Sequence, residues 1–172
     1  MICMTKELNG RILDIGGGGE GIIGRLYQAQ VTAIDRCQQE LDDAPDGFEK
    51  IKMDATHLDF PPDSFDHVTF FFTMMFLSQR EQPQAVAQAV RVLKPSGKLH
   101  IWDCDIASAY PEPFCIDLEI QLPYERISTT YGIGKLGGQS QASITRICTD
   151  AGLKLTHSHP LSDGFYLCFQ KI

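Results

Sequence analysis

A run of glycines between two apolar segments is the feature that most constrains how this chain can fold. Residues 11–15 are mainly apolar, Gly16–Gly19 and Gly21 follow, and an amphipathic segment begins near Glu20. Glycine adopts positive φ without penalty and lets backbone approach a ligand closely. A flexible linker would lack such core-forming flanks. The sequence therefore predicts a strand over 11–15, a ligand-binding turn and a helix over about 20–29.

The spacing of these glycines narrows the ligand. Gly16, Gly18 and Gly21 fit the dinucleotide-binding pattern G-x-G-x-x-G. However, Asp14 and Glu20 place two carboxylates where a diphosphate would sit on the helix N-terminus. Because like charges repel, the site favours a ligand with a positive charge and no phosphate. S-adenosylmethionine, with its sulfonium and ammonium groups, is such a ligand.

On these residues the chain resembles the class I S-adenosylmethionine-dependent methyltransferases. Their first motif is a strand that ends in hydrophobic-Asp-hydrophobic-Gly-x-Gly, which Leu13-Asp14-Ile15-Gly16-Gly17-Gly18 matches. Glu20 stands where many members have a third glycine, so that Gly21 takes over that part. The resemblance covers about residues 10–103 and implies S-adenosyl-L-methionine as cofactor, with S-adenosyl-L-homocysteine as product.

Two further acids stand where the resemblance expects cofactor contacts. Asp35 closes a predicted strand over 31–35, about 20 residues beyond the glycine loop, where a ribose-binding carboxylate belongs; a solvated acid at a strand end is the alternative. Asp54 and Ala55 follow a predicted strand over 48–53, where the family holds adenine, although Asp54 could instead cap the turn at 56–58. The cofactor-binding residues implied are Asp14, Gly16, Gly17, Gly18, Glu20, Asp35, Arg36, Asp54, Ala55 and Phe72.

The alternation of strand and helix patterns predicts an α/β fold, a doubly wound, mostly parallel sheet. The resemblance implies seven strands in a Rossmann-like arrangement. The continuous apolar run 67–72 suits a strand buried on both faces, and the segment before it, from Pro61 to Asp66, is similar to the family pattern. The remaining predicted elements of this part are a short helix at 38–41, a helix at 80–93, a turn at 93–98 and a strand at 99–103.

Two antiparallel hairpins are predicted in the C-terminal half. Residues 114–122 alternate strictly between apolar and polar and would pair with 126–131, as an insertion after the fifth strand. After a helix at 140–151, the segments 153–157 and 165–169 would close the sheet.

The insertion 104–138 is the predicted substrate cover. Only about ten residues precede the first strand, so a lid would come from this segment. The hairpin at 114–131 could instead be the edge of a homodimer, because exposed edges need covering. Residues 132–138 are glycine-rich and are expected to be flexible.

Composition limits the partners. The chain of 172 residues is long enough for one domain, 1–172, and its net charge of −7 argues against a nucleic-acid backbone as partner. No apolar stretch is long enough to span a membrane, and the N-terminus resembles neither a signal peptide nor an anchor, so a cytoplasmic location is expected. Six scattered cysteines predict neither a zinc site nor disulfides, and most are expected to be buried.

The expected reaction is methyl transfer by in-line displacement to a small-molecule acceptor, with oxygen, carbon, sulfur and metalloid centres all left open. The chain lacks the tetrapeptide Asn-Pro-Pro-Tyr, with which methyltransferases directed at amino groups of DNA and of some proteins hold their acceptor. His100, Asp103, Asp105 and Tyr131 are candidate bases, but each also fits a purely structural role, so no catalytic residue is assigned. A cofactor-binding protein without turnover and an NAD-dependent oxidoreductase remain as alternatives.

Overall fold

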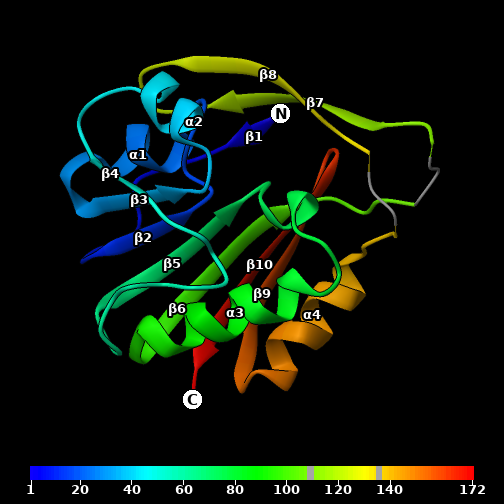
Figure 1. Ribbon diagram of the computed structural model, residues 1–172. Coiled ribbons are helices and arrows are strands. Elements are labelled where there is room, and N and C mark those ends of the chain that lie inside the picture. The colour runs from blue at the N-terminus through cyan, green and yellow to red at the C-terminus, as the bar shows by residue number, and fades with distance from the viewer. Residues whose placement is uncertain (108–110, 135–136) are drawn as a thin grey trace.

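A seven-stranded sheet forms the centre of the molecule (Figure 1). The structure, a computed structural model, describes residues 1–107, 111–134 and 137–172. The strand order is β4-β3-β2-β5-β6-β10-β9, in which the first five strands are parallel and β10 is antiparallel to both neighbours. The strands are β2 (Ile12–Ile15), β3 (Val31–Asp35), β4 (Glu49–Lys52), β5 (Phe65–Phe71), β6 (Leu93–Asp103), β9 (Leu153–Leu161) and β10 (Gly164–Lys171).

The direction in which successive strands are added to the sheet reverses at β2, which pairs with β3 on one side and with β5 on the other. In open α/β sheets, ligands bind at such a switch point, outside the carboxyl ends of the strands. The glycine loop leaves β2 at this place, so the fold puts it where a ligand is expected.

Apolar cores cover both faces of the sheet. Leu13 packs into the core beneath α3 (Glu81–Val92) and α4 (Gln141–Asp150), whereas its neighbour Ile12 packs into the core on the opposite face. That second core includes α1 (Ile22–Tyr27), while α2 (Gln38–Asp43) connects β3 to β4. Burial on both faces explains the continuous apolar runs of the parallel strands.

A second, three-stranded sheet completes the cover of the α1 face. It consists of β1 (Ile2–Cys3), β7 (Phe114–Gln121) and β8 (Arg126–Ile133), with β7 in the middle. The predicted hairpin is thus present, but its parallel pairing with the N-terminal residues was not foreseen. β1 pairs only with Ile120 and Gln121 at the end of β7, so it covers little of that edge, and a dimer contact through the hairpin stays a prediction.

The first helix is shorter than the sequence indicates. It begins only after Gly21, whose φ of 57° lies in the left-handed region, and it ends at Gln28, which has a φ of 52°. Residues Gln28–Gln30 continue as a 3-10 turn. The helical periodicity over 20–29 therefore includes residues that the structure places in turns.

The predicted turn at 93–98 lies within a bulged strand. Leu93 pairs with Phe65, but Lys98 pairs with His67, so the intervening residues of β6 bulge out, with Ser96 at a φ of 62°. Two further expectations concern the 104–138 insertion. Gly132 belongs to β8 rather than to a flexible loop, and of the 104–138 insertion, residues 108–110 and 135–136 lie outside the described part.

All six cysteines are described and free, as expected. Only half of them are buried, however, because Cys3, Cys37 and Cys115 are exposed. The expectation that most are core residues was therefore wrong.

Candidate functional site

The glycine loop folds tightly against the ends of its neighbours. The backbone N–H groups of Gly16 and Gly17 both donate to the carbonyl of Ile34, at 2.8 and 3.1 Å. A Cβ atom on Gly18 would lie 2.5 Å from Cβ of Glu40 and 3.0 Å from Oδ2 of Asp35. The loop therefore needs glycine at this place, because any side chain would displace the acids beside it.

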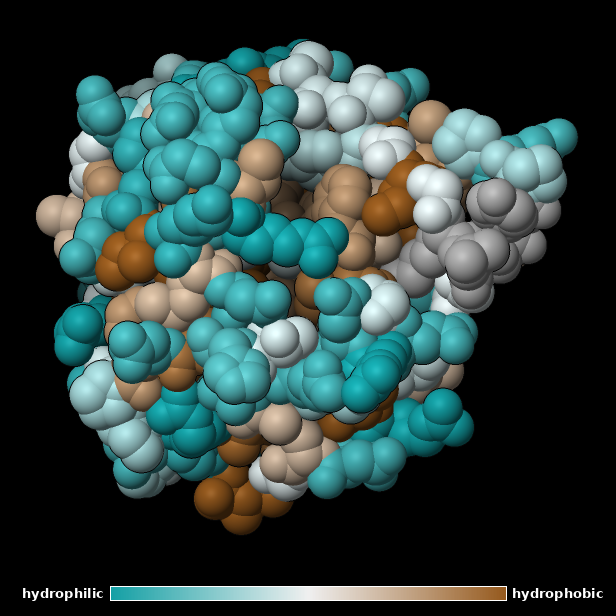
Figure 2. Space-filling model, viewed as in Figure 1, coloured by the Kyte–Doolittle hydropathy of each residue, from teal (hydrophilic) through white to brown (hydrophobic). Residues whose placement is uncertain are grey.

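A pocket of about 400 Å³ opens above this loop. Figure 2 shows a hollow at the centre of this face, with apolar residues in its walls and hydrophilic residues around it. The size is that of pockets for small molecules and cofactors. Its lining comes from Ile15 at the end of β2 with Gly16 and Gly18–Glu20 after it, Ile34 and Asp35 of β3 with Arg36 and Cys37 after it, Glu40 of α2, Met53–Ala55 after β4, Phe71 at the end of β5 with Phe72, Thr73, Phe76 and Leu77 after it, and Thr130–Gly132 of β8.

Carboxylates dominate the charge of this lining. Glu20, Asp35, Glu40 and Asp54 contribute acids, and among the described lining residues Arg36 is the one cation, 3.5 Å from Glu81. Partial burial and the charge of Asp35 raise the pKa of Glu40 above its usual value. The pocket thus favours a cationic ligand and disfavours a diphosphate.

Asp35 and Asp54 both reach the pocket. An Asp35 oxygen accepts the backbone N–H of Cys37 at 2.9 Å, at the end of β3. Asp54 accepts the N–H and the hydroxyl of Thr56, each at 2.7 Å, and these bonds lower its pKa. The two readings of Asp54 are therefore compatible, because one carboxylate caps the turn and also lines the pocket beside Ala55.

Asp14 lies behind the loop rather than in the pocket lining. Its side chain is buried, and the Thr69 hydroxyl donates to it at 2.7 Å. Desolvation raises its pKa to about 7. A Cβ on Gly17 would lie 2.5 Å from Oδ2 of Asp14, so this pair packs back to back. At neutral pH Asp14 is only partly ionised. The repulsion of a phosphate therefore comes mainly from the acids that line the pocket.

Glu20 joins the glycine loop to the β7–β8 hairpin. One of its carboxylate oxygens accepts the hydroxyl of Thr129 at 2.7 Å, and the other lies 3.5 Å from the hydroxyl of Tyr131. Arg25 adds a second link, because it donates to the Glu20 carbonyl at 2.6 Å and to Glu125 at 2.9 Å. The hairpin is thus tied to the loop that it covers.

Several lining side chains lie outside the cofactor-binding set assigned from the sequence, Glu40, Phe76 and Tyr131 among them. Glu40 belongs to α2, and nothing in the pattern of that helix marks it as facing the loop. Phe76 and Tyr131 meet near Phe72, whereas Met74 and Met75 are fully buried in the core. Phe76 follows β5 closely, but only the packing of β8 brings Tyr131 to it.

Three of the four candidate bases have structural roles. His100 is buried between His67 and Tyr166, with ring nitrogens 3.0 and 2.9 Å from their polar atoms, and burial lowers its pKa to about 3. Asp103 is buried and accepts the N–H of Met75, at 3.2 Å. Asp105 accepts the N–H of Gln141 where α4 begins.

Tyr131 lines the pocket, unlike the other three candidates. Burial and the nearby Glu20 raise the pKa of its hydroxyl, which stays protonated at neutral pH. Tyr131 can therefore contribute a ring and a hydrogen-bond donor, but not a base.

Two absences complete the description. Within residues 1–107, 111–134 and 137–172, no group of three or more His, Cys, Asp or Glu side chains is placed to hold a metal ion. None of the helices in the same ranges combines the length and the apolar character needed to cross a bilayer.

This chain is similar to known methyltransferases. Residues 13–101 match the family described as methyltransferase domain. A phosphatidylethanolamine N-methyltransferase from Cereibacter sphaeroides is 28% identical over 171 residues, covering 93% of this chain and 78% of that protein. Methyltransferase GfsG from Streptomyces halstedii is 36% identical over 124 residues, covering 61% of this chain and 44% of that protein, so the match spans less than half of this relative.

Among solved structures, an S-adenosylmethionine-dependent methyltransferase from Methanosarcina mazei superposes with a TM-score of 0.68. It is 17% identical, and the match covers 96% of this chain and 94% of that one, which shows a common fold. The family match spans more than half of the chain and includes the glycine loop and the ends of β3 and β5. The protein therefore belongs to the class I S-adenosylmethionine-dependent methyltransferases, with S-adenosylmethionine as its cofactor.

Proposed function

We propose that this protein transfers the methyl group of S-adenosylmethionine to a small-molecule acceptor beneath the β7–β8 hairpin. The observation that carries the proposal is the acidic pocket of about 400 Å³, which β8 covers at the switch point of the sheet. A pocket of this size suits a cofactor and a small acceptor group. The net charge of −7 further disfavours a nucleic acid as acceptor.

The lining fits the parts of the cofactor. Asp35, at the end of β3, is placed for the ribose hydroxyls, and Arg36 follows it. Asp54 and Ala55 stand beside Met53 where an adenine ring would lie against an apolar wall. Glu20 provides a carboxylate for the ammonium group.

The loop supports this arrangement from behind. Gly16, Gly17 and Gly18 let backbone approach the ligand, and Asp14 packs under Gly17. Phe72, at the end of β5, contributes an apolar wall. Eight of the ten assigned residues line this pocket, and the other two, Asp14 and Gly17, pack against each other behind it.

Catalysis is expected to depend on alignment. The cofactor supplies an activated methyl carbon. The protein has to hold the acceptor in line with that carbon and keep water out, and orientation alone contributes on the order of 7–11 kcal/mol in favourable cases. The β7–β8 hairpin, closed over the loop by Thr129 and Glu20, performs the exclusion of water in this proposal.

Calorimetry tests the cofactor site. S-adenosylmethionine and S-adenosylhomocysteine are expected to bind, and NAD much more weakly. Asp35→Asn should weaken S-adenosylhomocysteine at least about tenfold, because it loses charge-assisted hydrogen bonds. Asp150→Asn, at the exposed end of α4, is the matched control and should leave affinity unchanged. Tight NAD binding without heat from S-adenosylmethionine would overturn the proposal.

Transfer itself needs a second measurement. Incubation with labelled S-adenosylmethionine and a panel of small amines, alcohols, thiols and carboxylates should yield a methylated product for at least one class. Cofactor binding with no product from any class would instead indicate a binding protein without turnover.

A further inference from the structure

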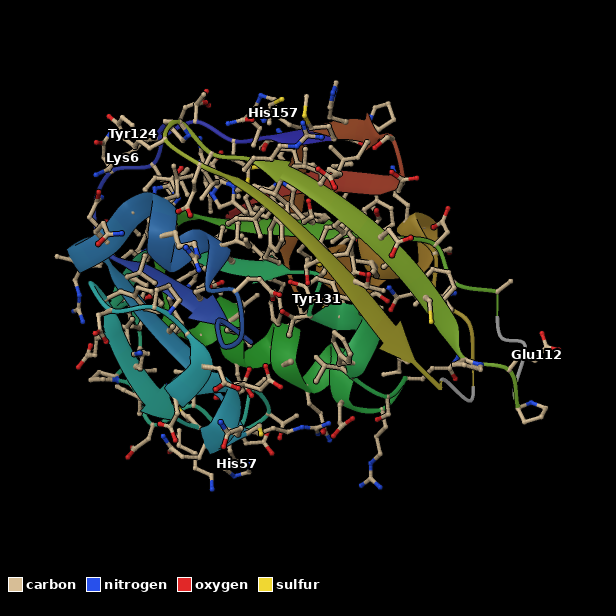
Figure 3. The ribbon with its side chains drawn as sticks, turned by 90° about the horizontal axis from the view of Figure 1, so that it is seen from above. Lys6, His57, Glu112, Tyr124, Tyr131 and His157 are labelled. Atoms are coloured by element: carbon tan, nitrogen blue, oxygen red, sulfur yellow. The ribbon has the colours of Figure 1, made fainter. Side chains whose placement is uncertain are left out.

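Three aromatic rings meet at one end of the pocket. The ring centroids of Phe72 and Tyr131 are 6.1 Å apart with planes inclined at 43°, and those of Phe76 and Tyr131 are 6.1 Å apart at 79°. Rings inclined in this way are adjacent walls rather than facing plates. We call Phe72, Phe76 and Tyr131 the aromatic corner. Figure 3 labels Tyr131 where β8 crosses above the central strands.

The aromatic corner leads from the mouth of the pocket to its interior. Phe76 is 38% exposed, whereas Phe72 is only 1% exposed, and both line the pocket. Tyr131 stands between them on the hairpin. A group that enters along Phe76 therefore reaches the deep end of β5 without leaving aromatic surface.

The charge of the pocket leaves room for a second cation. Its four carboxylates and one guanidinium carry a formal charge of −3. S-adenosylmethionine, with a sulfonium, an ammonium and a carboxylate, contributes +1, so the loaded pocket still carries −2. Glu20 lies beside the aromatic corner, 3.5 Å from the Tyr131 hydroxyl. An anionic or strongly polar neutral acceptor would find no complementary charge there.

We propose that the acceptor is an aliphatic amine, whose nitrogen is seated in the aromatic corner as a cationic head group. This inference rests on the proposed function and names its acceptor class. Aromatic faces carry partial negative charge and bind ammonium groups, and recognition strengthens when the cation is shielded from water. The corner and the surplus of acid therefore select the same kind of group by two independent physical effects.

The chemistry is consistent with the missing Asn-Pro-Pro-Tyr tetrapeptide. The lone pair of an aliphatic amine is localised on nitrogen, so it needs no hydrogen-bonding device to prevent delocalisation. The amine binds as its ammonium ion and loses a proton to solvent before its nitrogen attacks as the free base. The new N–C bond forms as the C–S bond breaks, and the electron pair of that bond stays on sulfur, which gives the thioether S-adenosylhomocysteine and a methylated ammonium.

The reaction moves a positive charge from sulfur to nitrogen. In this proposal the aromatic corner faces the place where that charge develops, so it binds the transition state more strongly than a neutral amine. The corner thus accounts for both the choice of acceptor and a part of the rate.

Binding of two isosteres tests the inference. The protein is first saturated with S-adenosylhomocysteine, and choline and 3,3-dimethylbutan-1-ol are then titrated by calorimetry. They have the same shape, but only choline carries a charge. Choline is expected to bind at least about fivefold more tightly. Equal affinities, or no detectable binding of choline, would overturn the inference.

Variants test whether the preference for choline arises at the aromatic corner. Tyr131→Leu should abolish the preference for choline, whereas Tyr131→Phe, which keeps the ring, should retain most of it. Tyr124→Leu, at the 99% exposed tip of the same hairpin, is the control and should change nothing. A preference that survives Tyr131→Leu would overturn the assignment to the corner.

The affinity of each variant for S-adenosylhomocysteine separates the two proposals. If the wild-type protein does not bind S-adenosylhomocysteine, the proposed function is contradicted. Normal affinity without a preference for choline would contradict the acceptor class alone.

Discussion

The two antiparallel hairpins of this protein have similar local structure but occupy different places in the fold. The β9–β10 hairpin joins the central sheet, where Leu167 and Phe169 are fully buried. The β7–β8 hairpin lies outside that sheet and buries only one face, with Leu118 turned inward between exposed neighbours. The first hairpin belongs to the frame of the fold, and the second covers the site.

Their attachments differ in kind. β10 forms ladders with both β6 and β9. β7–β8 is held by its apolar face, by two residues of β1, and by the contacts of Thr129 and Glu125 with the glycine-loop side. Polar contacts of this kind can be exchanged for contacts with a ligand, so the difference teaches where the molecule can respond to its cofactor.

The largest effect is expected in the frame. Phe169→Ala removes a fully buried ring from β10 and should lower the free energy of unfolding by about 3–5 kcal/mol, through lost burial and a residual cavity. Urea denaturation measures it. Tyr124→Leu, at the exposed tip of the other hairpin, should change stability by less than about 0.5 kcal/mol. A loss near zero for Phe169→Ala would contradict the role given to β10.

The stability of the protein should depend on pH in opposite ways through Asp14, behind the glycine loop, and His100, in β6 of the central sheet. Asp14 has its folded pKa raised to about 7, so its contribution to stability is full below the unfolded value of about 4 and is lost as pH rises through 7. His100 has its folded pKa lowered to about 3, so its contribution is lost as pH falls below about 6.5. The two groups therefore oppose each other in the acid range.

Asp14→Asn isolates the first of these effects. Asparagine can still accept the Thr69 hydroxyl but does not ionise, so the variant should gain stability relative to wild type on going from pH 5 to pH 8. The expected gain is on the order of 3 kcal/mol in the cofactor-free protein. Denaturation curves at both pH values measure it, and parallel pH profiles of the two proteins would contradict the raised pKa.

An intermediate effect is expected where the hairpin meets the loop. Thr129→Val removes the donor to Glu20 and should destabilise the closed hairpin by about 1–2 kcal/mol, because a hydrogen bond to a charged group is lost. Hydrogen exchange of β7–β8 amides should then accelerate about tenfold, while β10 amides stay protected. Ser128→Ala, which loses only an exposed contact with Glu119, is the control. Equal acceleration in both hairpins would contradict the comparison.

The smallest effect is expected at the hairpin tip. Glu125→Gln breaks a partly exposed ion pair with Arg25 and should cost less than about 1 kcal/mol, and this cost should shrink as salt is added. The measurement is the same exchange experiment at low and high salt. A large, salt-independent loss would mean that Arg25 anchors the hairpin in another way.

Much of the fold could be predicted because its signals are local. The glycines after β2, the acid that ends β3 and the alternation in β7 each follow from neighbours in sequence. The boundaries were less certain, because helical periodicity does not reveal where Gly21 and Gln28 adopt positive φ. The bulge in β6 was read as a simple turn for the same reason, since Pro95 and Gly97 fit both.

The candidate site could be predicted only in part. Asp35 was assigned from its spacing to the glycine loop and Asp54 from the family resemblance, and both line the pocket because strand ends converge in a parallel sheet. Glu40 was not assigned to the pocket and Tyr131 was named only as a candidate base, because their place depends on how α2 and β8 pack against the loop. The burial of Asp14, and with it the raised pKa, is likewise invisible in the chain.

The sequence by itself determined the glycine loop, the order of strands and helices and the preference for a cationic cofactor, since these depend on residue type and short-range spacing. Only the tertiary structure decided that Ile2–Cys3 would complete a second sheet, that Glu20 would fasten β8, and that three rings would meet over the pocket. The reason is physical. A local pattern specifies which face of a segment is buried, whereas a site between distant segments exists only once their packing has brought them together and removed water from between them.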